Sequence, residues 1–298
     1  MTSNGIPDPP LIVLTGPTAC GKSEVALELG LRLSRQGSPC EIITADSMQV
    51  YRYMDIGTAK PDVDMRARLP HHMIDIAEPT ETYNVSRYQK EASQILLSLL
   101  HQGKGVLVAG GTGLYIKALV DGLNDAPAGD SRIREQLEKE AKTLGTAALY
   151  ERLSTIDPEA AEKIDPLNLR RIIRALEVFE ISGKTFSQFH REQRIPQWKD
   201  KFVWVALRMP LKELDRRIDQ RTRKMFERGL VEEVRRLLGM GCRREHTSMQ
   251  GLGYKEIAQG LADGLTEQAM EGSLSFRQAL EKRIALLKPH KKHLEQLA

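Results

Sequence analysis

The sequence predicts an α/β protein: a parallel β-sheet with helices on both faces, into which an all-helical domain is inserted. Short, unbroken apolar runs alternate with helix-patterned stretches in the first half, at 11–14, 41–45, 73–76 and 106–109. Such runs are typical of parallel strands that are buried on both faces. Strand character then disappears and returns only at 202–208. We therefore expect residues 1–123 and 201–298 to form the α/β core with C-terminal helices, and residues 124–200 to form the helical insertion.

The composition argues against several classes of protein. With 298 residues, 41% of them hydrophobic, the chain is long enough for one large domain with an insertion. No apolar run approaches the ~20 residues that span a bilayer, and the N-terminal MTSNGIPDPP lacks the charged and apolar regions of a secretory signal. The three scattered cysteines are too few for a disulfide framework or a zinc site. We expect a cytoplasmic protein with no membrane partner.

The net charge of +4 is unevenly distributed along the chain. Residues 1–129 carry 11 Lys and Arg against 14 Asp and Glu, whereas residues 130–298 carry 33 against 26. The resulting excess of +7 in the second half suits a polyanionic partner. A solvated, basic helical surface explains the charge equally well at this stage.

The first glycine-rich turn joins the apolar run at 11–14 to a helix-patterned stretch. Its sequence is G-x-x-x-x-G-K-S, formed by Gly16, Pro17, Thr18, Ala19, Cys20, Gly21, Lys22 and Ser23. In this motif backbone N–H groups surround phosphate oxygens, and both the helix dipole and the lysine favour the anion. The flanking pattern predicts a P-loop NTPase-like fold. The motif alone is typical of ATP-binding proteins, and it does not identify the phosphorylated molecule that is bound.

Other polar residues follow the predicted strands, at the edge where parallel sheets bind ligands. Asp46 directly follows the second apolar run, where it suits a Mg²⁺ ligand, a general base or the cap of a turn. The irregular segment 54–61 is long enough to be functional. A second glycine-rich turn, 110–113, places Thr112 near the same edge. No Asp ends the run at 106–109 and no N-K-x-D motif is present, which argues against a GTPase or a motor.

The insertion presents arginines on one face of a helix. This helix is expected to start at Asp165–Pro166, with Asp as its cap and Pro in the first turn. At about 100° per residue, the apolar residues of 169–179 form one face, and Arg170, Arg171 and Arg174 fall on the opposite face. Converging arginines suit phosphodiester contacts, although a solvated face has the same pattern.

The helix expected to open at Pro210 carries two arginines beside its apolar stripe. Arg217 and Arg221 lie one turn apart along the edge of that stripe, where they suit a pyrophosphate clamp. Ion pairs with Asp215 or Asp219 are the structural alternative. The expected buried stripe consists of Leu211, Leu214, Ile218, Thr222 and Met225.

Together these segments resemble the bacterial-type tRNA dimethylallyltransferases, a family also called tRNA isopentenyltransferases or IPP transferases. The resemblance covers roughly residues 9–260, and its linked motifs are GPTACGKS (16–23), DSMQVYRYMDIGTAKP (46–61), HHMIDI (71–76), GGTGLYIKAL (110–119), DPLNLRRIIRALEV (165–178) and GLGYKEI (251–257). The phosphate loop is generic, whereas the second motif and the order of all six are specific. The basic stretch at 276–293 lacks the Trp that family members carry there. This difference affects the expected C-terminal contacts with tRNA and not the expected transfer chemistry.

The resemblance implies that a five-carbon allyl group moves from dimethylallyl diphosphate to N6 of an adenosine in tRNA. That adenosine lies directly 3′ of the anticodon, at tRNA position 37, in tRNAs that read codons beginning with U. The phosphate loop would then hold the diphosphate leaving group through Thr18, Lys22 and Ser23, with Ser23 on Mg²⁺, the one cofactor implied. Arg221 with Arg217 would complete the clamp, and Asp46 would accept a proton from the adenine amine.

The resemblance also assigns contacts to the tRNA anticodon stem-loop. The target base must leave its stack to reach the allyl carbon, and single-stranded loops are where proteins read RNA bases. The chain is expected to act as a monomer. The matching positions are Asp46, Ser47, Met48, Gln49, Thr112, Arg134, Arg170, Arg171, Ile172, Ile173, Arg174, Gln250, Gly251, Leu252, Gly253, Tyr254 and Lys255.

Cys20 stands in the phosphate loop where a small Ser is common in the family. A partly exposed thiol beside a helix N-terminus oxidises easily. We therefore expect Cys20 to be sensitive to oxidants.

Three other functions compete with this interpretation. A small-molecule P-loop kinase explains the phosphate loop but not the basic second half. Isopentenylation of free adenine nucleotides needs no helical insertion. A non-catalytic RNA-binding protein with a relic phosphate loop tolerates the loss of Asp46 without effect beyond binding.

Overall fold

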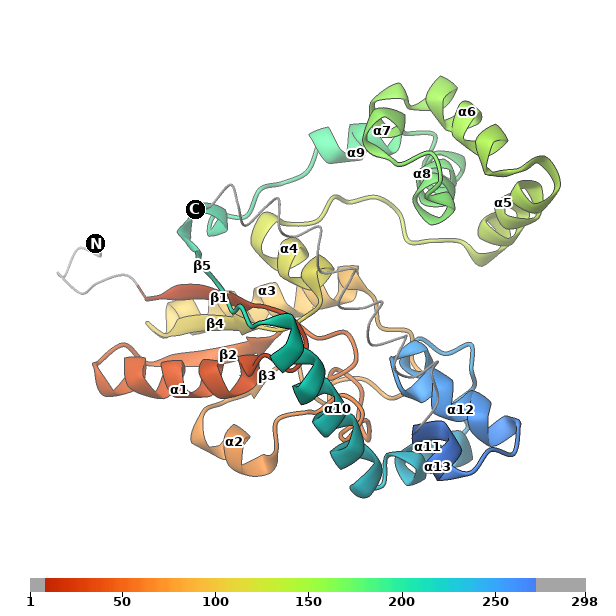
Figure 1. Cartoon of the computed structure of the whole chain (residues 1–298). Coiled ribbons are helices and arrows are strands. Elements are labelled where there is room, and N and C mark those ends of the chain that lie inside the picture. The colour runs from red at the N-terminus through yellow and green to blue at the C-terminus, as the bar shows by residue number, and fades with distance from the viewer. Residues whose placement is uncertain (1–8, 272–298) are drawn as a thin grey trace. The chain divides into compact units, whose positions relative to one another are not determined.

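The computed structural model describes residues 9–271, which divide into two compact units (Figure 1). Residues 121–197 form the helical unit, and the described residues on either side of that segment form the α/β unit. These limits lie within three residues of the boundaries expected from the sequence. No helix in the described part of the chain combines the length and the apolar character needed to cross a membrane.

The α/β unit is built on a five-stranded sheet in the order β3-β2-β4-β1-β5, and all its neighbouring strands are parallel. This confirms the predicted parallel α/β fold. The strands are β1 (Leu11–Thr15), β2 (Cys40–Thr44), β3 (His71–His72), β4 (Gly105–Ala109) and β5 (Val203–Ala206). The helices are α1 (Lys22–Arg35), α2 (Val63–Arg68), α3 (Val85–His101), α4 (Gly113–Asp121), α10 (Leu211–Glu227), α11 (Leu230–Gly239), α12 (Tyr254–Ala262) and α13 (Glu267–Glu271), with 3-10 turns at Lys199–Lys201 and Ser248–Gln250.

Alternate side chains of the central strands fill two different cores. Ile42 and Leu107 pack with residues of α1 in one hydrophobic cluster, whereas Ile43 and Val108 pack with residues of α3 and α4 in another. Figure 1 shows α1 on one face of the sheet and α3 and α4 on the other. Because successive side chains of a strand point to opposite faces, the unbroken apolar runs in the sequence are what a sheet covered on both faces requires.

The third strand lies earlier than the sequence predicted. The expected strand at 73–76 is wrong, because His71 and His72 pair with β2 instead. Met73 and Asp75 have positive φ angles of 64° and 56°, a backbone conformation that does not continue a strand. The imidazole of His72 contacts the carboxylate of Glu41 at 2.6 Å, so these residues tie the edge strand to its neighbour.

The helical unit contains the five helices α5 to α9, whose bounds are Ser131–Leu144, Thr146–Ile156, Pro158–Lys163, Leu169–Ser182 and Phe186–Arg191. Helix α8 starts later than predicted, because Asn168 is its cap and accepts a hydrogen bond from the backbone N–H of Arg171. The Asp-Pro start occurs instead at α7, where Asp157 caps the helix and Pro158 occupies its first turn.

Helix α10 buries a narrower stripe than predicted. Leu214, Ile218 and Thr222 are buried, whereas Leu211 is 60% exposed at the first position of the helix. The basic stretch at 276–293 lies outside the described residues.

The carboxyl ends of β4 and β2 approach each other so closely that only glycine fits at position 110. A Cβ atom there would lie 2.1 Å from the carbonyl oxygen of Ala45. The adjacent Gly111 has no heavy atom within 4 Å of an added Cβ. Neither glycine has a positive φ angle, so the contrast between them is steric.

The Gly110→Ala variant is expected to lower the free energy of unfolding by about 1–3 kcal/mol, the usual cost of overpacking a rigid interior. The matched Gly111→Ala variant is expected to stay close to wild type, because its methyl group meets open space. Urea denaturation of the two variants measures the difference. Equal stabilities would contradict the close approach of the two strand ends.

Candidate functional site

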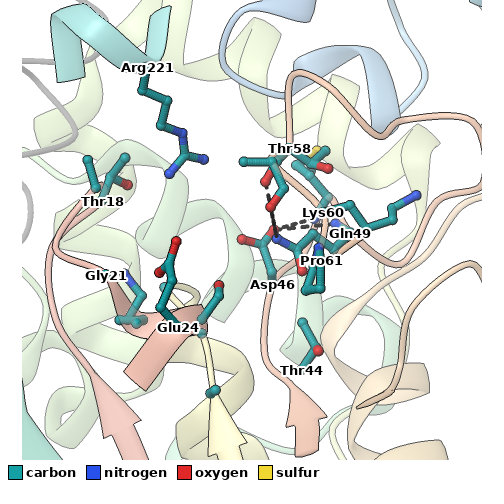
Figure 2. A pocket seen from close by; sticks show the side chains of 18 of the residues that line it. Thr18, Gly21, Glu24, Thr44, Asp46, Gln49, Thr58, Lys60, Pro61 and Arg221 are labelled. Carbon is teal, nitrogen blue, oxygen red and sulfur yellow. Dashed lines mark hydrogen bonds between the residues drawn. The ribbon is translucent and has the colours of Figure 1, made fainter. Parts of the chain in front are cut away.

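A cavity of about 870 Å³ lies at the carboxyl ends of the central strands. The strand order brings the ends of β2, β4 and β1 side by side, so the segments that follow them converge. The cavity is lined by the phosphate loop, Asp46, the segment 57–62, the glycines after β4, and residues of α10. Figure 2 shows Thr18 and Gly21 on one side of this cavity, and Asp46, Gln49 and Thr58 on the other.

The phosphate loop contains residues in the left-handed backbone region, which favours glycine. Ala19 and Gly21 have φ angles of 64° and 89°, and Gly21 immediately precedes α1. The Lys22 ammonium donates to the carbonyl oxygens of Gly16 at 2.9 Å and Pro17 at 2.7 Å. All eight predicted loop residues except Pro17 line the cavity. The arrangement provides backbone N–H groups and a cation for an anionic ligand.

Cys20 is buried, contrary to the partly exposed thiol expected from the sequence. Its sulfur packs under Gly16, where an added Cβ would lie 2.9 Å away. Burial raises the pKa of the Cys20 thiol, against the smaller opposing effect of nearby Lys22. Because the thiolate is the oxidisable form, the burial of Cys20 and its raised pKa argue against the predicted oxidant sensitivity.

Asp46 follows β2 in a turn that the second glycine-rich segment holds in place. Its Oδ1 accepts hydrogen bonds from the backbone N–H groups of Met48 at 2.9 Å and Gln49 at 3.4 Å. The hydroxyl of Thr112 accepts from the N–H of Ser47 at 3.0 Å, and the N–H of Thr112 donates to Ala45. One carboxylate oxygen of Asp46 therefore fixes the turn, and the side chain lines the cavity.

The two arginines predicted on α10 both line the cavity. Figure 2 shows the Arg221 side chain extending from its helix toward the side where Thr18 lies. The Arg217 guanidinium donates to Glu213 at 2.9 Å, rather than to Asp215 or Asp219. Hydrogen bonds from Arg216 and Arg217 lower the pKa of Glu213 to about 2. Glu213 is thus the acidic partner that the sequence analysis missed.

The turn before α12 closes the cavity beside Asp46. Leu252 and Tyr254 line it, whereas Gln250 and Lys255 are exposed. A Cβ at Gly251 would lie 2.8 Å from the sulfur of Met48. The predicted RNA-contacting stretches 46–49 and 250–255 are therefore brought together by the fold.

The sequence analysis also missed Glu24, Thr58 and Lys60 as cavity-lining residues. Lys60 is a structural cation: its ammonium contacts Asp55 at 2.7 Å and Asp75 at 2.6 Å, and its side chain is only 2% exposed. Its place in the specific motif 46–61 was visible in the sequence, but its two carboxylate partners were not.

The donor groups of the cavity suit a metal only if a ligand supplies most of the oxygens. No group of three or more His, Cys, Asp or Glu side chains within residues 9–271 is arranged to hold a metal ion. The Ser23 hydroxyl lines the cavity at the start of α1. Mg²⁺ takes oxygen ligands and commonly combines a few protein groups with substrate phosphates and water, so Ser23 fits such an ion beside a bound diphosphate.

The arginines predicted in the helical unit fall into two groups. Arg170 and Arg171 are exposed on α8. Arg134 and Arg174 instead hold the fully buried carboxylate of Glu177, at 3.0 Å and 2.7 Å. Arg174 also donates to the carbonyl of Pro127 at 2.6 Å, which ties α8 to the segment that leads into the unit.

Two residues of the predicted RNA-binding stretch belong to the core of the helical unit. Ile172 and Ile173 are 0% and 4% exposed and pack among apolar side chains of α5, α6 and α7. We therefore remove them from the predicted interface, since RNA cannot reach a side chain inside a packed core.

Comparison with known proteins gives consistent matches over most of the chain. The family described as IPP transferase matches residues 49–288. A protein from Geotalea uraniireducens named tRNA dimethylallyltransferase 2 is 44% identical, over 86% of this chain and 81% of the relative. A tRNA dimethylallyltransferase from Geobacter sulfurreducens is 42% identical, over 85% of this chain and 79% of the relative.

Solved structures agree with these relatives. A full-length tRNA isopentenylpyrophosphate transferase from Bacillus halodurans has a TM-score of 0.65 at 34% identity, and the match covers 95% of this chain and 87% of that one. A eukaryotic dimethylallyltransferase acting on tRNA has a TM-score of 0.73 at 25% identity, covering 93% of this chain and 70% of that one.

Proposed function

The chain belongs to the IPP transferase family, and from that premise we propose that it transfers a dimethylallyl group from dimethylallyl diphosphate to tRNA. The acceptor is N6 of the adenosine 3′-adjacent to the anticodon, in tRNAs that read codons beginning with U. The observation that carries the proposal is a single cavity lined by both a phosphate loop and the Asp46 carboxylate. The product is an N6-isopentenyladenosine, and diphosphate is released.

The phosphate loop side of the cavity binds the leaving group in this proposal. Breaking an allylic C–O bond places negative charge on the diphosphate, so the rate depends on electrostatic stabilisation of that charge. On one side of the cavity, this stabilisation comes from backbone N–H groups of 18–23, the Lys22 ammonium and the hydroxyls of Thr18 and Ser23. From α10, it comes from the guanidinium groups of Arg217 and Arg221. When bound, Mg²⁺ on Ser23 would neutralise further charge on the phosphate oxygens.

Asp46 acts on the acceptor. Because its Oδ1 is held by the turn, the carboxylate has a fixed orientation toward the cavity. It accepts a hydrogen bond from the exocyclic amine and takes a proton as the C–N bond forms. An aromatic amine is a weak nucleophile, so its alignment with the allyl carbon matters as much as the base.

The helical unit grips the anticodon stem-loop in this proposal. Arg170 and Arg171 are the exposed arginines of α8 available to phosphodiester groups. The target adenosine leaves its stack to enter the cavity. We further propose that the protein works as a monomer in the cytoplasm. Neither a kinase nor an enzyme of free nucleotides is supported by the comparisons, which name tRNA-modifying relatives.

One assay tests the proposed function. Purified protein is incubated with allyl-labelled dimethylallyl diphosphate and either tRNA or AMP as acceptor. The proposal predicts label on tRNA and none on AMP. Label on AMP alone would contradict it and would favour the free-nucleotide enzyme.

Asp46→Asn tests the base. The asparagine oxygen can still accept from the Met48 N–H, so the turn is kept while the basic oxygen is replaced by an amide. The rate of transfer at saturating tRNA is expected to fall about 10²–10⁴-fold, with little change in the Kd for tRNA. Transfer at the wild-type rate would exclude Asp46 as the base.

Arg171→Gln and Arg174→Gln test whether each arginine contacts RNA or stabilises the helical unit. The exposed Arg171 is expected to contribute a phosphate contact, so its loss weakens tRNA binding and lowers the salt dependence by about one counterion. Arg174→Gln instead removes one of the two arginines that pair with the buried Glu177 and is expected to lower the thermal stability of the helical unit. Salt titrations of tRNA binding and thermal melts measure both effects, and a wild-type salt slope for Arg171→Gln would remove it from the interface.

A further inference from the structure

Glu233 is a buried carboxylate that the proposed chemistry does not use. It lies on α11 and is only 2% exposed. Its Oε2 accepts from the backbone N–H groups of Asp55 at 3.0 Å and Ile56 at 2.9 Å. Its Oε1 accepts from the N–H of Gly57 at 3.2 Å and from the hydroxyl of Tyr254 at 2.6 Å.

Three successive N–H groups of one loop therefore converge on a single side chain. Such consecutive backbone N–H groups form a concave anion site, and here the anion is supplied by another part of the same chain. Partly buried N–H groups that lose an acceptor carry a free-energy cost, so the Glu233 carboxylate favours this conformation of the loop. The Tyr254 hydroxyl donates to the same carboxylate. Burial, together with the charge of Glu233, raises the pKa of Tyr254.

The loop held in this way is a wall of the cavity. Residues 57–61 line it directly. Packing also fixes the wall against Tyr254, because a Cβ at Gly57 would lie 2.6 Å from the tyrosine ring. Three amides of this loop are bonded to Glu233, and Gly57 packs against the Tyr254 ring. These contacts restrict the movement of the loop.

This wall supports the side of the cavity where Asp46 lies. The amide of Gln49 donates to the carbonyl of Thr58 at 3.1 Å, which joins the loop to the segment that follows Asp46. Figure 2 shows Gln49 and Thr58 beside Asp46 and away from Thr18 and Gly21. Tyr254 belongs to the 250–255 turn, whose Gly251 packs on Met48. Glu233 thus anchors two segments, the loop at 55–57 and the turn that contains Tyr254, and both of them contact the residues that follow Asp46.

We propose that Glu233 is a positioning residue for the acceptor nucleotide: it holds the loop 55–59 and Tyr254 in register with Asp46–Gln49, and it acts on acceptor use rather than on donor binding. The inference rests on the proposed function, because it assigns this side of the cavity to the acceptor. Glu233 touches no substrate in this account. Its effect passes through the loop and the tyrosine.

Glu233→Gln is the direct test. The amide keeps the shape of the side chain but presents N–H groups to backbone N–H donors, so part of the cradle is lost. We expect kcat/KM for tRNA to fall about tenfold or more, while the Kd for dimethylallyl diphosphate stays within about twofold of wild type. If kcat/KM for tRNA and the affinity for dimethylallyl diphosphate fell by the same factor, the substitution would disturb the whole cavity, and the proposal would be overturned.

Glu232→Gln is the matched control. Glu232 is the neighbouring residue on α11, its side chain is 65% exposed, and it pairs with Arg235. The substitution removes the same charge from the same helix without touching the loop, and we expect wild-type kinetics. Tyr254→Phe removes one donor of the cradle and keeps the ring, so a smaller loss of tRNA kcat/KM is expected, and this variant carries the test if Glu233→Gln does not fold.

Hydrogen exchange gives a readout that does not depend on activity. The amides of 55–57 are expected to exchange at least about tenfold faster in Glu233→Gln than in wild type, with α1 unchanged. Unchanged exchange together with wild-type tRNA kinetics would overturn the inference. If the wild-type protein transferred nothing to tRNA, the proposed function would fail, while the exchange data would still test whether Glu233 holds the loop.

Discussion

The cavity depends on the close approach of two strand ends, β2 and β4. The N–H of Ala45 donates to Ala109 at 2.8 Å, and the carbonyl of Ala45 accepts from Thr112 at 3.0 Å. Only a glycine at 110 permits this spacing. The result is that the Asp46 turn and the phosphate loop after β1 open into the same space. The Asp46 carboxylate and the phosphate loop therefore face one cavity from opposite sides.

In the proposed function, the phosphate loop binds a diphosphate leaving group and does not serve nucleotide hydrolysis. The cradle, Lys22 and the α10 arginines gather positive charge and N–H groups on one side. On the other side, Asp46 and neutral polar groups are held by contacts through Thr112, Gln49 and Glu233, and the charge of Lys60 is paired with Asp55 and Asp75. Such a division fits a reaction in which the anion leaves and a neutral amine attacks.

The parts of the site that depend on local sequence could be predicted. The eight residues of 16–23 and the position of Asp46 after a strand follow from motif and pattern, because the turn and the helix start are encoded by neighbouring residues. The third strand was misplaced, because the apolar run at 73–76 has left-handed residues at Met73 and Asp75 that its composition does not reveal. Glu177 and Glu233 were missed for another reason: Arg134, which pairs with Glu177, and the loop amides that Glu233 accepts from lie far from these glutamates in the sequence.

The arginines illustrate the same limit. A helical wheel gives the angular position of a residue but not its partner. It therefore could not distinguish Arg174, which pairs with a buried carboxylate, from Arg171, which is exposed. Likewise, Ile172 and Ile173 share a motif with the arginines but belong to the core. Burial and pairing, which depend on tertiary contacts, decide these roles.

The most direct test of the central claim, that the phosphate loop holds a leaving group, is transfer from doubly labelled dimethylallyl diphosphate. The allyl group carries ¹⁴C, both phosphates carry ³²P, and tRNA is the acceptor. The account predicts that one ¹⁴C-labelled allyl group enters tRNA for each intact ³²P-labelled diphosphate that is released. Transfer of ³²P to the acceptor, or release of monophosphate without ¹⁴C in tRNA, would contradict it.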